Sequence, residues 1–171
     1  MKKQRPTIPI SEWKIAAHLE ATRNIQNQEG TPAHGCECEW CLNWKSCYKE
    51  LLPVELQEQL LRIGLQLGNP TDLYQFDSNE HSSSIRVVYH AIGKILSGPP
   101  NQWQNNEVGK MLMYQTIREE PYLSLVVFPQ SQSFDPSPVL KDKAAGDLIR
   151  IDFRLSVPSS YIKTNKVSKN A

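Results

Sequence analysis

The sequence of 171 residues lacks an excess of charge of either sign, because 19 Lys and Arg face 18 Asp and Glu and leave a formal net charge of +1. Proteins that bind duplex nucleic acid neutralise its phosphates with a clear excess of basic residues. This chain has no such excess, so we do not expect nucleic acid to be its partner.

Long apolar runs are missing as well. Segment 123–128 is one of the longer ones, whereas a membrane-spanning helix needs about 20 apolar residues. We therefore expect no membrane span. Residues 1–5 are basic, but Pro6 and Pro9 interrupt the stretch that would form the apolar part of a signal peptide. These absences predict a cytoplasmic protein, in which the four cysteines stay reduced.

The common catalytic motifs are also absent. The sequence has no P-loop, no G-x-G-x-x-G dinucleotide fingerprint, no G-x-S-x-G nucleophile elbow and no H-E-x-x-H zinc motif. Because no catalytic constellation is visible, the leading interpretation is a non-enzymatic binding or interaction protein. Its partner would be a protein or a small ligand, held by the face of a sheet or by the groove between sheet and helices.

The sequence does contain enough apolar material for a core, since 39% of its residues are hydrophobic. In the first part of the chain the apolar residues are spaced three and four apart, as on one face of a helix. We predict a helix beginning near Ser11 and a second over 37–51. A third helix follows Pro53, a residue favoured in the first turn, and ends at Gly64 or Gly68.

The second part is richer in β-branched and aromatic residues. It predicts strands over 73–76, 85–96, 111–118, 122–128 and 148–157. We expect His90, inside the second of these strands, to be a hydrogen-bonded core or sheet residue rather than a catalyst.

The last predicted strand alternates strictly between apolar and polar residues. The apolar set, which we expect to point into the core, is Ile149, Ile151, Phe153 and Leu155. The polar set, which we expect to face solvent, is Arg150, Asp152 and Arg154.

Helices first and strands later predict an α+β fold, with N-terminal helices packed on a mainly antiparallel sheet of about four to five strands. We expect a single domain over 11–158, with a helical part over 11–68 and a sheet part over 73–158. Residues 1–10 would be a flexible N-terminus and 159–171 a basic C-terminal tail. The connection over 129–146 is long, and connections of that length are often functional or mobile.

Three of the four cysteines, Cys36, Cys38 and Cys41, fall within one short segment. If a helix starts near Glu37, Cys38 and Cys41 lie about 60° apart on one face, and Cys36 can fold back toward them. Cys47 would point elsewhere and belong to the core.

Three interpretations of this cluster remain open. The first is a zinc or other soft-metal site with His34 as a fourth ligand, helped by the helix dipole, which favours thiolates. Against it, the sequence has no second pair of ligands at the spacing of familiar zinc modules. The second is a redox role with a reversible disulfide, and the third is plain burial of small residues.

The segment Cys36, Cys38, Cys41, Asn43 and Trp44 resembles the C-x-C-x-x-C-x-N-aromatic element of a family of small uncharacterised bacterial proteins. Similar residues of this chain follow at Leu52 and Pro53, Leu67 to Pro70, Tyr74 and Phe76, Tyr89 to Gly93, and Val157 and Pro158. A Trp common in that family after the last Pro is replaced by Ser159. The resemblance implies a bacterial cytoplasmic protein of unknown function and assigns no residue a role.

The sequence therefore leaves two functions, of which the binding or interaction protein is the leading one. The alternative is a metal- or thiol-dependent enzyme, because three thiolates with an open fourth position can hold a catalytic zinc. An unpaired edge strand could also join two copies in a homo-oligomer.

Overall fold

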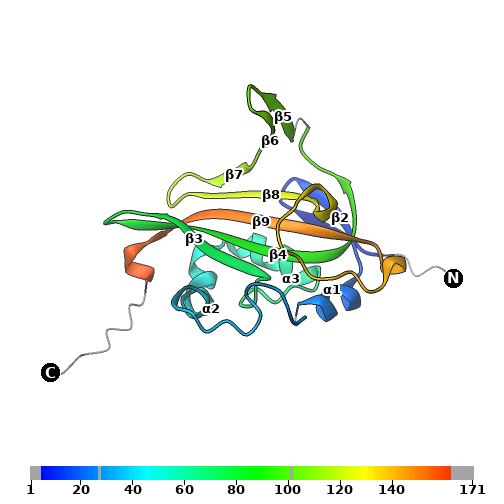
Figure 1. The fold of residues 1–171 in the computed structure, drawn as a ribbon, viewed down its shortest axis with the longest axis horizontal. Helices are drawn as coiled ribbons and strands as arrows, with labels where there is room; N and C mark the ends of the chain where they lie inside the picture. Colours follow the sequence, from blue (N-terminus) through cyan, green and yellow to red (C-terminus); the bar gives the residue numbers. More distant parts are fainter. Residues whose placement is uncertain (1–4, 27, 101, 163–171) are drawn as a thin grey trace.

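The structure is a computed structural model that describes residues 5–26, 28–100 and 102–162, and its main feature is one large antiparallel sheet (Figure 1). The strands of this sheet are β1 (Thr7–Ile10), β2 (Trp13–Ala17), β3 (Asp72–Ser78), β4 (Ser82–Ser97), β7 (Gln115–Arg118), β8 (Leu123–Pro129) and β9 (Asp147–Pro158). Their order is β1-β2-β4-β9-β8-β7, and β3 also pairs with β4. The long strand β4 therefore has β9 along one side, and β3 and then β2 along the other.

The remaining elements are short. Three α-helices are described, α1 (Leu19–Ile25), α2 (Glu39–Leu51) and α3 (Val54–Arg62). A separate hairpin of β5 (Trp103–Asn106) and β6 (Gly109–Leu112) projects away from the sheet (Figure 1). Single turns of 3-10 helix occur at η1 (Gln130–Gln132), η2 (Lys143–Ala145) and η3 (Ser159–Tyr161).

One face of the sheet forms the main core with α2 and α3. In β9 the predicted apolar set is buried as expected, and it pairs in register with alternate residues of β4. The indole N–H of Trp44 in α2 donates to Leu67 O and to the Tyr89 hydroxyl of β4, both at 2.9 Å. Leu56 and Leu60 of α3 join the same cluster. Cys47 is buried there too, as predicted.

The fold is α+β in broad terms, but the sheet is larger than predicted, with seven strands instead of four to five. The two additional strands are β1 and β2, and β2 lies where a helix beginning near Ser11 was predicted, so that prediction is wrong. Residues Ile8, Ile10, Trp13 and Ile15 are buried with exposed residues between them, which is the period of a hairpin. Strand β1 thus lies inside the stretch 1–10 that was expected to be flexible, and the first helix begins only at Leu19.

The prediction that the polar set of β9 faces solvent is also wrong for two of its three residues, which lie on the opposite face of the sheet. Arg150 and Asp152 do not face solvent but have an exposed fraction of 0%, and only Arg154 of the polar set is exposed. The chain after β8 folds back over this face, as the contacts of Gln130 and Asp135 described below demonstrate. No helix among the described residues is long and apolar enough to cross a membrane.

Candidate functional site

The thiol cluster lies at the start of α2. Gly35 adopts a φ of +63°, and the turn that it forms brings Cys36 back toward the helix. Cys38 is the N-cap residue, and its Sγ accepts a hydrogen bond from the backbone N–H of Cys41 at 3.5 Å. The backbone N–H of Cys38 in turn donates to Cys36 Sγ at 3.4 Å. The turn at Gly35 and the first turn of α2 therefore bring the three sulfur atoms together, and two of these atoms accept hydrogen bonds from backbone N–H groups.

All three Sγ atoms lie within 4.8 Å of one another. Tetrahedral zinc with Zn–S bonds of about 2.3 Å separates its sulfur ligands by about 3.8 Å. Small side-chain rotations would close that difference. The cluster of Cys36, Cys38 and Cys41 can thus hold a metal ion as predicted, although the arrangement does not select one metal.

The three thiols differ in exposure, and the pKa values of Cys38 and Cys41 are shifted in opposite directions. Cys38 is exposed, Cys36 is half-buried and Cys41 is buried. Hydrogen bonds from the Cys36 thiol and then from the Cys41 backbone lower the pKa of Cys38. Burial, followed by the hydrogen bonds and charges of the other two sulfurs, raises the pKa of Cys41. Plain burial accordingly explains Cys41 and Cys47 but not the exposed Cys38.

His34, the fourth ligand suggested by the sequence, is not a member of this group of atoms. It lines a small pocket of about 160 Å³ together with Cys36 and Cys41. Its role as a ligand therefore stays a prediction.

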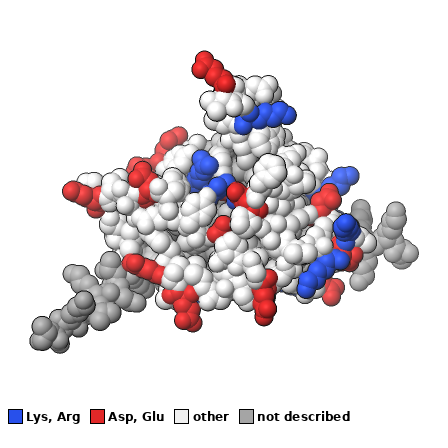
Figure 2. All heavy atoms as spheres, viewed as in Figure 1, with Lys and Arg blue, Asp and Glu red and all other residues white. Residues whose placement is uncertain are grey.

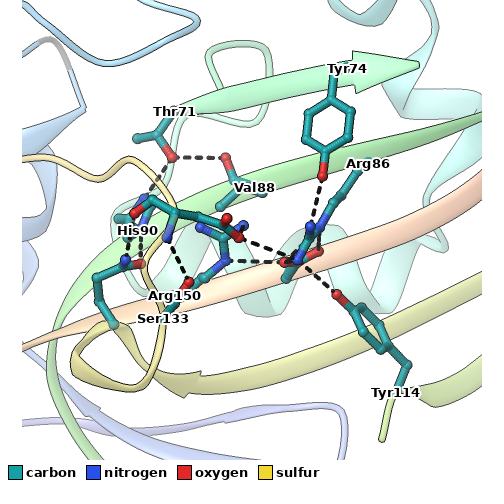
Figure 3. Close-up of polar contacts among 11 residues, drawn as sticks. Thr71, Tyr74, Arg86, Val88, His90, Tyr114, Ser133 and Arg150 are labelled. Atoms are coloured by element: carbon teal, nitrogen blue, oxygen red, sulfur yellow. Dashed lines mark hydrogen bonds and ion pairs between the residues drawn. The ribbon is translucent and has the colours of Figure 1, made fainter. Parts of the chain in front are cut away.

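A second cluster, which sequence reasoning missed, lies on the sheet face opposite α2 and α3 (Figure 3). At its centre is the buried carboxylate of Asp152. Arg86 Nε donates to both oxygens of this carboxylate at 2.9 Å, and Arg86 Nη2 donates to Oδ2 at 2.6 Å. Arg150 Nε donates to the same Oδ2 at 3.1 Å. In Figure 2 basic and acidic atoms lie side by side near the middle of this face.

The segment after β8 completes this polar cluster. Asp135 Oδ2 lies 3.1 Å from Arg150 Nη2 and 3.7 Å from Arg86 Nη2. The contact with Arg150 is electrostatic, because neither Nη1 nor Nη2 of Arg150 makes a hydrogen bond with any described residue. The buried charges are therefore balanced in part by a carboxylate from the long connection over 129–146.

Two tyrosines hold the outer end of the Arg86 side chain. Arg86 Nη1 donates to the Tyr74 hydroxyl at 2.7 Å, and Nη2 donates to the Tyr114 hydroxyl at 3.2 Å (Figure 3). Burial alone would lower the pKa of Arg86, but the hydrogen bonds and charge of Asp152 outweigh it and raise the pKa. Arg86 is thus a permanent cation held in one orientation.

His90 occupies the buried end of the same face and is hydrogen-bonded, as predicted. Its Nε2 lies 2.7 Å from Gln130 Oε1 and its Nδ1 lies 2.7 Å from Thr71 Oγ1. Since an amide oxygen only accepts, Nε2 carries the proton, and the neutral ring leaves Nδ1 as an acceptor. The single proton of the Thr71 hydroxyl is therefore shared between two acceptors, Nδ1 at 2.7 Å and Val88 O at 3.0 Å. Burial lowers the pKa of His90 to about 4, so the ring is neutral.

A signal for this cluster exists in the sequence but requires the strand pairing. Arg86 and His90 share one face of β4, and Arg150 and Asp152 share one face of β9. Only the β4–β9 register brings the two faces together. The segment after β8 that covers this face is held there by contacts with distant residues, and no local sequence pattern predicts its position.

Comparisons with protein-family models, with curated proteins and with solved structures found no match. The resemblance to the bacterial family with a C-x-C-x-x-C-x-N-aromatic element accordingly stays a prediction.

Proposed function

We propose that this chain is a non-enzymatic binding protein that carries a metal ion, zinc in the first instance, on Cys36, Cys38 and Cys41. The observation that carries the proposal is the approach of the three sulfur atoms to within 4.8 Å at the N-cap of α2. Thiolates are the ligands that zinc and other soft metals prefer. A cytoplasmic location belongs to this proposal, because the thiols must stay reduced to bind the metal.

The metal would have a structural role and would stabilise the fold. Residues 28–38 connect α1 to α2 without forming a helix or a strand, and backbone hydrogen bonds such as Ala33 N to Thr71 O hold them. A metal bound by Cys36 and by the first turn of α2 would fix the end of this connection. Structural zinc contributes its binding energy directly to folding. Removal of the metal should therefore lower the melting temperature.

The experiment is elemental analysis of protein purified without added zinc, with thermal melts before and after a chelator. We expect about one metal ion per chain, lost in Cys38→Ser and retained in Cys47→Ala. Cys47 is the matched control because it lies in the same helix but outside the cluster. A metal-free wild type whose melt responds neither to zinc nor to chelator would refute the metal site.

The alternative, a thiol-dependent enzyme or redox protein, draws support from Cys38 alone, because this thiol is exposed and its pKa is lowered. Mass mapping after mild oxidation distinguishes the two. A reversible disulfide within the cluster, in protein that contains no metal, would favour the alternative.

A further inference from the structure

A pocket of about 480 Å³ lies between the β5–β6 hairpin and the part of the large sheet that carries Arg86 and Arg154. Its lining comes from the hairpin, from β4, from β9 and from the chain just before β7. Small-molecule sites commonly have volumes of about 300–1,000 Å³. The pocket is therefore large enough for a small organic ligand.

The polar part of this lining has one sign of charge. Arg86, Lys110 and Arg154 contribute three cations, and no Asp or Glu belongs to the lining. Asp152 neutralises the charge of Arg86, but Arg154 and Lys110 form no ion pair with any described residue. Two cations with unused donors consequently face the pocket, and an anion would satisfy them.

The side chain of Arg154 is also held in place. Its guanidinium carbon lies 4.3 Å from the centre of the Tyr114 ring, and Tyr114 is itself fixed by the hydrogen bond from Arg86. Burial raises the pKa of Tyr114 to about 12, so this phenol adds no negative charge. A guanidinium stacked on a ring keeps its N–H groups at the edge, where they can bind an oxyanion.

The other part of the lining is apolar. Val108, Met111 and Leu112 belong to the hairpin, and the first two are exposed. The only acidic residue of the hairpin, Glu107, stands in its turn and does not line the pocket. The lining thus offers donors to an acid group and an apolar wall to the rest of a ligand.

We propose that this pocket binds a small organic anion, with its phosphate or carboxylate group on Arg154 and Lys110 and its apolar body against the hairpin. The proposal names the ligand class for the binding protein proposed above. It uses none of the cysteines, so its failure and the failure of the metal site are distinguishable.

Titration calorimetry with the full chain tests the proposal. The probes are phenyl phosphate and benzoate as organic anions, benzyl alcohol as a neutral ring and inorganic phosphate as a bare oxyanion. We expect both organic anions to bind more tightly than inorganic phosphate, and benzyl alcohol not to bind. Which of the two organic anions binds more tightly distinguishes a phosphate from a carboxylate site.

The variants are Arg154→Gln and Lys110→Gln, with Lys94→Gln as the matched control. Lys94 is an exposed cation on β4 that pairs with Ala16, away from the pocket. Loss of one charge-assisted contact should weaken binding by about tenfold in each pocket variant. All three substitutions change exposed side chains and should leave the melting temperature nearly unchanged.

Three results would overturn the proposal. The first is the absence of heat from both organic anions. The second is equal affinity of Arg154→Gln and Lys94→Gln, since the charge at Arg154 would then play no part. The third is inorganic phosphate binding as tightly as phenyl phosphate, because the apolar wall would then contribute nothing.

Discussion

Replacement of Asp152 by Asn removes the one negative charge at the centre of the buried polar cluster and keeps the shape of the side chain. Arg86 and Arg150 together donate four hydrogen bonds to this carboxylate. In the variant one acceptor oxygen becomes an NH2 group that faces the two guanidinium groups. Both arginines stay charged, and Arg150 stays fully buried.

The magnitude follows from the cost of removing one partner from a buried ion pair, which is about 3–5 kcal/mol. The NH2 group also loses at least one of the four hydrogen bonds, each of which is worth about 1.5–3 kcal/mol with a charged acceptor. For a chain of this size that corresponds to a melting temperature lower by roughly 6–20 °C.

Urea denaturation of the wild type and of two variants measures the effect. Asp147→Asn is the matched control, because Asp147 lies on the same strand but is exposed. Its free energy of unfolding should stay within about 0.5 kcal/mol of the wild type. If Asp152→Asn costs less than about 1 kcal/mol, a value typical of exposed pairs, then the buried ion pairs described here are not the interactions that hold this face together.

Three further predictions concern other parts of the fold. Phe153→Ala should lower the free energy of unfolding by about 3–5 kcal/mol in urea melts, because Phe153 is fully buried against Tyr89; a loss below about 1 kcal/mol would contradict this packing. The free energy of unfolding should fall as the pH drops from about 6.5 to 4, by up to about 3 kcal/mol, because the folded state keeps His90 neutral while the unfolded state binds a proton. His90→Gln should flatten that part of a pH series of melts, and an unchanged slope would contradict the assignment. In native protein from which metal has been removed, the exposed Cys38 should react with an alkylating reagent and the buried Cys47 should not. Mass mapping measures the two reaction rates, and equal rates would contradict the placement of α2.

The elements that sequence predicted well are those with a local cause. Helix α2 follows from the three-and-four spacing of its apolar residues, and α3 begins directly after Pro53, its N-cap. The buried apolar set of β9 follows from a strict period of two. The thiol cluster is local as well, because Cys36 and Cys38 precede the same helical turn that carries Cys41.

The elements that sequence missed depend on contacts between distant segments. The apolar residues around Trp13 have a spacing that fits both a helix and a strand. Pairing with β1 and β4 makes this segment a strand. Alternation alone places Arg150 and Asp152 on a polar face, but it cannot indicate that the chain after β8 covers that face. The pocket beside Arg154 likewise requires a hairpin that lies far away in the sequence.

We propose above that Cys36, Cys38 and Cys41 hold one metal ion together. X-ray absorption at the zinc edge of the zinc-loaded protein reports the type and distance of the atoms bound to the metal. We expect three sulfur ligands at about 2.3 Å, and fewer in Cys38→Ser. A shell of nitrogen and oxygen atoms without sulfur, or no bound zinc at all, would contradict it.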